Sequence, residues 1–126
     1  MKRLFAAAVL FAVILIICFT SHFAVKGSIR TAQAEIDKCK ALYYAKDYTG
    51  TYTAVQTFSD NWHKSKMLIS AFTNHRPLDD ISMLAASIHA AVKAKNDFQF
   101  YYAVNQVIAQ LEMIEHEHSL SFENMY

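Results

Sequence analysis

The segment Phe100–Ile114, "FYYAVNQVIAQLEMI", decides the fold class of this chain. Its large apolar residues recur three or four positions apart, at Phe100, Val104, Val107, Leu111 and Ile114. On an α-helix this spacing places side chains along one face, one above the other. Such a stripe must be covered by another element, so the segment predicts a helix that packs against neighbours.

Three other segments repeat this spacing, and each predicts a further helix. Their apolar positions are Ile29, Ala32, Ile36, Cys39 and Tyr43; Val55, Phe58, Trp62, Ile69 and Phe72, if Ser65 fills one turn; and Ile81, Leu84, Ile88 and Val92. The chain holds only two glycines and one proline, which favours helices over strands that need frequent turns. We therefore expect an all-α fold, a small antiparallel four-helix bundle made of two helical hairpins.

Polar residues and one proline mark the breaks between these helices. Asp47 is placed to cap the second helix, and Asn96 introduces the fourth. Pro77 is expected to stop the second helix, which places His75 at that helix's C-terminus, where it could bond the last carbonyls. The break at residues 46–52 also resembles the one at 96–102, at an offset of 50 residues. Tetratricopeptide-like helix pairs are one interpretation, but their repeats use another spacing and normally need three units, so we interpret this as chance similarity between two helix turns.

The N-terminus carries a long uncharged stretch, Leu4–Val25, close to the ~20 residues that cross a bilayer as a helix. A cleaved signal peptide is the alternative, but its best cleavage pair, Ala32 and Ala34, lies far beyond the apolar core. We therefore expect a retained signal-anchor transmembrane helix at 1–26, contacting the lipid bilayer through residues 4–25, and a bundle domain at 27–126.

Charges near this stretch suggest an orientation. Lys2 and Arg3 favour a cytoplasmic N-terminus, although basic residues after the stretch weaken the asymmetry. The expected location is thus the cell membrane, as a single-pass protein with its C-terminal domain extracytoplasmic. Cys18 lies in the apolar stretch and Cys39 in the bundle, so an intramolecular disulfide is not expected.

The C-terminal run "LEMIEHEHSLSFENMY" raises the question of a metal site. The candidates are Glu112, Glu115, His116 and His118. Glu115 and His118 have the Glu-x-x-His spacing of carboxylate-bridged metal bundles, but these bundles need two such motifs. On a helix His118 falls near the buried stripe and His116 points away from it. We expect a solvated helix end, with no metal and no cofactor.

Other functional classes lack their signatures. Cys39 could pair with His63, His75 or His89 as a nucleophile and base, but it lies on an apolar stripe, where cysteine usually packs as a small hydrophobic residue. From Gly27 onward the sequence contains nine Lys and Arg and eleven Asp and Glu, so no basic stripe that could bind nucleic acid is expected. We expect neither an enzyme nor a nucleic-acid-binding protein.

Four features in their order along the chain carry a family resemblance: the apolar N-terminal stretch with Trp62 after it, "FTNHRPLDDI", "NDFQFYYAVNQVIAQLEMI" and "EHEHSLSFENMY". This order resembles the small membrane proteins grouped as domain of unknown function 4363, most closely over residues 58–126. The resemblance implies a single-pass protein of bacterial type with a helical domain outside the cytoplasm. It implies no activity, and it marks Trp62, His75, Asp79 and Asn124 as interaction candidates.

Two functional hypotheses follow. The first is a membrane-anchored interaction module that binds another membrane or envelope component through an exposed apolar or acidic face, because one small core cannot bury all the aromatic residues near the two similar breaks. These are Tyr43, Tyr44, Tyr48, Tyr52, Phe98, Phe100, Tyr101 and Tyr102. The alternative is an extracytoplasmic metal- or ligand-binding sensor that uses His75, Glu115, His116 and His118.

Overall fold

The computed structural model describes the backbone of residues 1–71 and 75–124, and the side chains of residues 1–71 and 76–120. It contains α1 (Lys2–Tyr44), α2 (Tyr48–Ile69), α3 (His75–Ala94) and α4 (Asp97–Asn124). Within this described part no residue lies in a β-strand. The prediction of an all-α fold is confirmed.

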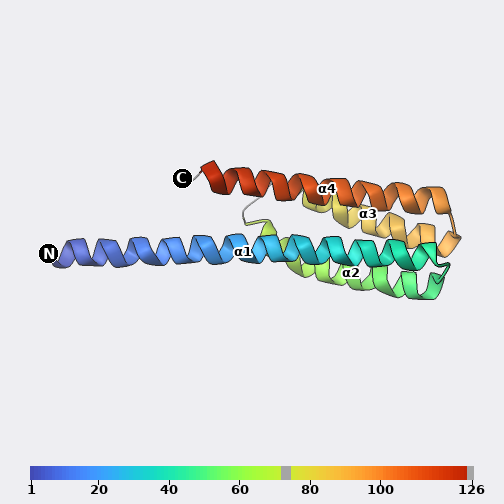
Figure 1. Ribbon diagram of the computed structural model, residues 1–126, viewed down its shortest axis with the longest axis horizontal. Helices are drawn as coiled ribbons and strands as arrows, with labels where there is room; N and C mark the ends of the chain where they lie inside the picture. Colours follow the sequence, from blue (N-terminus) through green and yellow to red (C-terminus); the bar gives the residue numbers. More distant parts are fainter. Residues whose placement is uncertain (72–74, 125–126) are drawn as a thin grey trace.

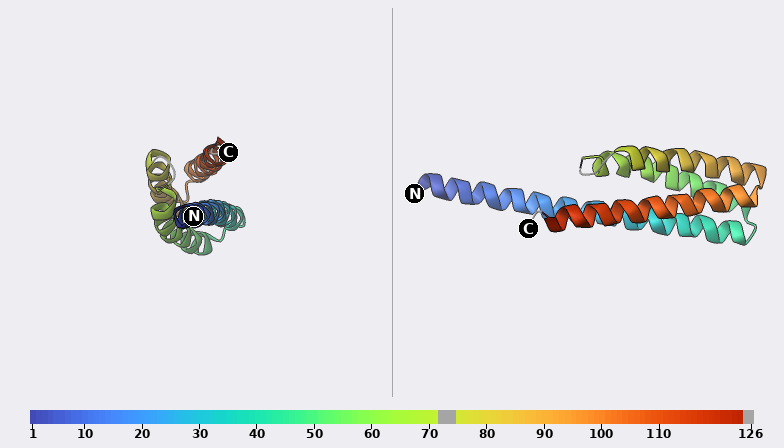
Figure 2. Two further views of the ribbon diagram at one scale, coloured as in Figure 1. Left: turned by 90° about the vertical axis from the view of Figure 1, so that its left-hand side faces the viewer. Right: turned by 90° about the horizontal axis from the view of Figure 1, so that it is seen from above.

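The four helices run up and down around a common axis (Figures 1 and 2). Each helix packs against two neighbours, in the cyclic order α1, α2, α3, α4 and back to α1. The α1–α2 and α3–α4 turns lie together at the end of the bundle furthest from the N-terminus, which we call the distal end (Figure 1). Two antiparallel hairpins packed side by side therefore form the bundle, as the sequence predicts.

The predicted apolar stripes form most of the core, although Leu84 is only partly buried and Phe72 lies outside the described residues. All five stripe residues of α1 and all five of α4 are buried. Trp62 of α2 is among the largest side chains in the core, and its indole Nε1 donates to the carbonyl of Leu78 on α3 over 3.2 Å. Each large side chain buried in this way stabilises the fold by about 1.5–3 kcal/mol. The core is thus continuous across all four helices.

One helix joins the apolar stretch to the bundle without a break. α1 passes through Gly27 and continues to Tyr44, while its N-terminal part projects beyond the other helices (Figure 1). This projecting part is long and apolar enough to cross a membrane, and none of its most apolar window is buried in the bundle. A membrane anchor and a signal sequence share these properties. His22 contacts His118 of α4 and Val25 is fully buried, although both lie inside the stretch expected to face lipid.

The α1–α2 turn contains a lysine in a left-handed conformation. Lys46 has a φ of 63°. Its N–H donates to the carbonyl of Tyr43 over 2.9 Å, and the N–H of Asp47 donates to Leu42 over 3.0 Å. This pair of bonds is the Schellman motif, in which the left-handed position is usually occupied by glycine.

The α3–α4 turn repeats the same motif. Lys95 has a φ of 53°. Its N–H donates to the carbonyl of Val92 over 3.1 Å, and the N–H of Asn96 donates to Ala91 over 2.9 Å. The two turns are therefore equivalent at an offset of 49 residues, one less than the sequence similarity suggested.

The residue after each lysine caps the next helix. A carboxylate oxygen of Asp47 accepts a hydrogen bond from the N–H of Gly50 over 3.0 Å, and the Oδ1 of Asn96 accepts one from Gln99 over 3.1 Å. A Cβ at position 50 would clash with a carboxylate oxygen of Asp47, so a larger residue there would force the capping side chain to shift. Both predicted capping residues are confirmed.

The prediction that Pro77 ends the second helix is wrong. α2 ends at Ile69, and α3 already begins at His75, so Pro77 lies in the first turn of α3. Proline suits a first helical turn because its fixed φ is helical and the missing N–H has no partner there. His75 therefore lies at the start of a helix, not at the C-terminus of the preceding one, and its side chain lies outside the described residues.

Candidate functional site

Exposed aromatic side chains gather at the distal end. Tyr44 is 82% exposed, Phe98 81% and Tyr102 58%. The rings of Phe98 and Tyr102 lie one helical turn apart on α4 with centroids separated by 6.2 Å. Phe98 and Tyr102, together with Tyr101, also contribute to a shallow cavity of about 450 Å³. We call Tyr44, Phe98 and Tyr102 the distal aromatic surface.

Buried aromatic rings support this surface from beneath. The ring of Tyr43 stacks on Phe100 at 3.8 Å between centroids, and Tyr101 packs edge-on against both. The hydroxyl of Tyr43 donates to the carboxylate of Asp97. Burial and the nearby carboxylate raise the pKa of Tyr43 well above its ordinary value. Tyr43 therefore stays protonated and ties α1 to the start of α4.

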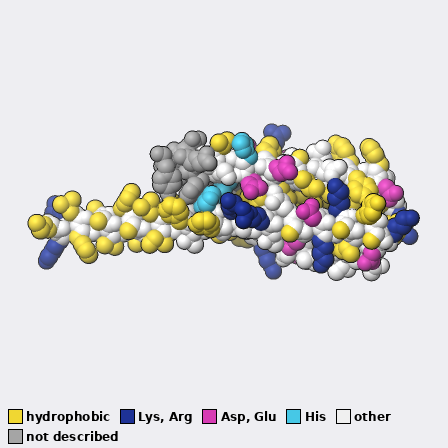
Figure 3. Space-filling view, in the orientation of Figure 1, with side chains coloured by type: hydrophobic (Ala, Val, Ile, Leu, Met, Phe, Trp, Pro, Cys, Tyr) yellow, Lys and Arg dark blue, Asp and Glu magenta, His cyan; other side chains and the backbone are white. Residues whose placement is uncertain are grey.

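The distal end is also basic. Residues 38–54 and 88–103 together contain five lysines and two aspartates, a formal charge of +3, whereas the rest of residues 27–126 carries −5. Lys46 and Lys95 are exposed, and Lys95 lies over the ring of Tyr48 at 5.0 Å. Asp47 caps α2 and Asp97 accepts from Tyr43, and neither forms an ion pair with a described residue. The space-filling view shows basic, acidic and apolar side chains together at this end (Figure 3).

A histidine pair joins α1 and α4 near the opposite end. The Nδ1 of His22 lies 3.0 Å from the Nε2 of His118, with the two rings inclined by only 16°. His118 is 8% exposed. Burial, and then the neighbouring His22, lower the pKa of His118. A hydrogen bond between two imidazoles needs one donor and one lone pair, so at least one ring is neutral.

The predicted metal candidates do not converge. His118 faces the bundle and His116 is exposed, as their helical positions predicted. Glu115 accepts a hydrogen bond from Gln33 of α1 over 3.2 Å, and Glu112 is exposed. Among the described residues, no three His, Cys, Asp or Glu side chains gather where they could hold a metal ion.

The interaction candidates Trp62 and Asp79 lie where α2 contacts α3, since the indole of Trp62 bonds to the carbonyl of Leu78, next to Asp79. Trp62 is buried, so it serves the core, while Asp79 is exposed and pairs with Lys66. The side chains of His75 and Asn124 lie outside the described residues. These positions do not form one described surface.

Cys39 sits in a setting that suppresses thiol chemistry. The side chain is fully buried, and burial, with Glu35 nearby, raises its pKa to about 11. Its suggested partner His63 is exposed on α2. The thiol therefore stays protonated near neutral pH and packs as part of the core.

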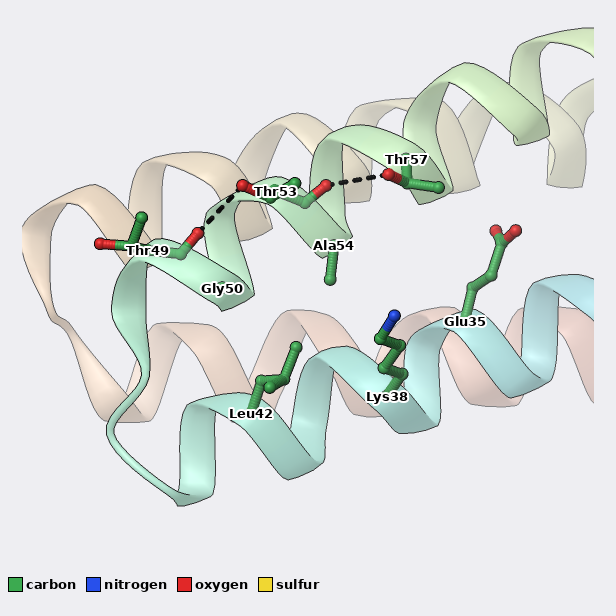
Figure 4. Close-up of a pocket in the computed structure, with 8 residues that line it drawn as sticks. All are labelled: Glu35, Lys38, Leu42, Thr49, Gly50, Thr53, Ala54 and Thr57. Carbon is green, nitrogen blue, oxygen red and sulfur yellow. Dashed lines mark hydrogen bonds between the residues drawn. The ribbon is translucent and has the colours of Figure 1, made fainter.

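A groove of about 500 Å³ lies between α1 and α2 (Figure 4). Its lining residues are Glu35, Lys38, Leu42, Thr49, Gly50, Thr53, Ala54 and Thr57. The hydroxyls of Thr53 and Thr57 donate to backbone carbonyls one turn earlier, and Glu35 accepts from Asn61 over 2.6 Å. Most polar groups of the groove are thus already bonded within the protein.

The position of His22 and the left-handed conformation of the two lysines were not predicted from the sequence. His22 was counted with the lipid-facing stretch, and its helical spacing to Val25 and Ile29 was the available signal that it shares their face. The left-handed lysines carried a subtler signal, since each precedes a capping Asp or Asn directly after an alanine.

Comparisons with known proteins agree with the family resemblance. A family model described as "Domain of unknown function (DUF4363)" matches residues 19–125. No curated protein and no solved structure matches the chain. The matched region contains the histidine pair, the part of α1 from residue 19 onward, the helices α2, α3 and α4, and the distal end. Because the match covers most of the sequence, this chain belongs to the DUF4363 family.

Proposed function

We propose that this protein is a membrane-anchored interaction module for another membrane or envelope protein. The N-terminal part of α1 is the anchor, a single pass with a cytoplasmic N-terminus, and the bundle is extracytoplasmic. The partner binds at the distal aromatic surface. No catalytic step is part of this proposal.

The exposure of Tyr44, Phe98 and Tyr102 is the observation that carries it. Large aromatic side chains are normally buried, and aromatic residues are enriched in the centres of protein interfaces. These three lie on two adjacent helices at one end of the bundle. A partner that covers them would remove a large apolar area from water.

The continuous helix makes the presentation rigid. At 1.5 Å per residue, the part of α1 from His22 to Tyr44 spans about 30 Å. The distal end therefore stands at a set distance from the apolar stretch, and no flexible linker separates the two. Such a rigid spacer suits contact with a protein that itself extends from the membrane.

Site-specific photo-crosslinking in intact cells tests this function. A photoreactive phenylalanine analogue replaces Phe98 in one variant and Ala109, an exposed residue of the same helix, in the matched control. We expect a discrete crosslinked protein from position 98 and little or none from position 109. Equal crosslinking from both positions, or none from position 98, would contradict the proposal.

The histidine pair favours a second candidate function, an extracytoplasmic metal- or ligand-binding sensor. His22 and His118 come from different helices, so a ligand bound between them would change how α4 packs on α1. Titration of the full chain in detergent micelles with zinc, followed by NMR of the histidine rings, tests it. A sensor would show binding tighter than about 1 mM that His118→Gln removes and His116→Gln leaves intact.

A further inference from the structure

The lysines of the two distal turns occupy positions where lysine is not the most stable residue. Lys46 and Lys95 both have positive φ values, which L-residues with a side chain adopt at a cost. Glycine is the usual residue at this place in a Schellman motif, and asparagine is the next most tolerant. Strain of this kind is retained where the side chain has another role.

The electrostatic setting indicates what that role is. The two aspartates among residues 38–54 and 88–103 are used in a helix cap and in the bond from Tyr43, and the lysines there form no ion pair with a described residue. Lys46 and Lys95 therefore lie near exposed aromatic rings, in a region where five lysines outnumber two aspartates. A ligand complementary to this surface carries negative charge.

We propose that the distal end binds an acidic segment of a protein partner, with Lys46 and Lys95 contacting its carboxylates and the distal aromatic surface contacting its apolar residues. This inference rests on the proposed interaction function and names the chemistry of the partner. Carboxylate–lysine contacts select the partner, and aromatic burial adds affinity.

An acidic protein segment fits better than an anionic lipid surface. The distal end lies about 30 Å along α1 from His22, and electrostatic attraction to headgroups decays over about 8–10 Å at physiological salt. In the proposed topology the lysines thus stand beyond the reach of the bilayer that holds the anchor.

A binding assay with purified full-length protein tests the charge preference directly. The protein is placed in nanodiscs of zwitterionic phosphatidylcholine, and the probe is a labelled peptide of about twenty glutamates. We expect binding that weakens when salt is raised, because screening reduces charge attraction. The double variant Lys46→Asn/Lys95→Asn, which keeps residues tolerant of positive φ, should lose at least tenfold in affinity, and Lys46→Arg/Lys95→Arg should retain it.

A matched control removes the same charge elsewhere. Arg30→Gln/Lys64→Gln takes two cations from exposed positions outside the distal end. Affinity for the probe should stay within twofold of wild type. An equal loss of affinity in both double variants would overturn the inference, because binding would then depend on the total charge of the protein and not on the distal lysines. Binding of anionic phosphatidylglycerol vesicles in preference to the peptide would overturn it in favour of a lipid ligand.

Crosslinking from position 98 tests the acidic partner separately from the proposed interaction function. A crosslinked partner peptide with more Asp and Glu than Lys and Arg, lost in the Lys46→Asn/Lys95→Asn background, supports both. An unchanged crosslink in that background overturns the acidic partner and leaves the interaction function standing. The absence of any crosslink in wild type removes the interaction function and this inference with it.

Discussion

The imidazoles of His22 and His118 lie 3.0 Å apart although 96 residues separate them in sequence. This contact joins the beginning of the packed part of α1 to the last turns of α4. Together with the Gln33–Glu115 and Tyr43–Asp97 bonds, it links the two helices that close the bundle. The stability of that closure therefore depends on the protonation of a buried ring.

Lowering the pH from about 7 to about 5 should reduce the free energy of unfolding. The pKa of His118 is depressed in the folded state, so between that value and the ordinary value near 6.5 the unfolded chain binds more protons. The contribution of neutral His118 to stability is therefore fully present above pH 6.5 and is lost as the pH falls. Urea unfolding at several pH values measures this. His118→Gln should flatten the dependence, and exposed His116→Gln should not; the same slope in both variants would contradict the assignment.

Replacing Lys46 or Lys95 by glycine should stabilise the fold. Glycine relieves the positive φ at each turn, partly offset by the extra freedom it gives the unfolded chain, for a net gain of about 0.5–1 kcal/mol each. Thermal unfolding measures the change. Ala45→Gly, at an adjacent residue with a φ of −76°, should give no gain. A fall in stability in either lysine variant would mean that the lysine side chain contributes packing at the turn.

Replacing Trp62 by alanine should destabilise the bundle by about 3–5 kcal/mol, because it removes a large buried side chain. Trp62→Phe should cost less, about 1–3 kcal/mol, since it keeps much of the volume and removes only the indole donor to the Leu78 carbonyl, which also accepts from the hydroxyl of Ser82. Chemical denaturation measures both. Met67→Ala, at a residue that is largely exposed, is the control and should have little effect. A similarly small effect of Trp62→Ala would contradict its place in the core.

Cys39 should resist thiol reagents in the folded protein and react after denaturation. With a pKa of about 11 and a fully buried side chain, its thiolate is scarce and inaccessible. Gln56→Cys, at an exposed position on α2, should react readily.

The Gln56→Cys variant also tests the topology. In intact cells a membrane-impermeant maleimide should label it if the bundle is extracytoplasmic. Labelling only after the cells are opened would place the bundle in the cytoplasm and reverse the proposed topology.

Local sequence patterns were sufficient to predict the helices and most of the core residues. Helical periodicity depends on neighbours within one or two turns, so Phe100, Val104 and Leu111 could be placed on one buried face without knowledge of the fold. The same reasoning separated His118, which is buried, from His116, which is not. Asp47 and Asn96 were identifiable as caps because capping is also local. The start of α3 at His75 was missed, since proline is compatible with both a helix end and a helix beginning.

The sequence by itself determined that this is a helical protein with one long apolar stretch, because both properties follow from the order of neighbouring residues. Only the tertiary structure decided that His22 meets His118, that the two turns with left-handed lysines lie at the same end, and that Tyr44 and Phe98 remain exposed there. These features depend on how α4 returns along α1 and on where the two hairpins meet. The packing of helices far apart in the chain sets that geometry, and no local pattern encodes it.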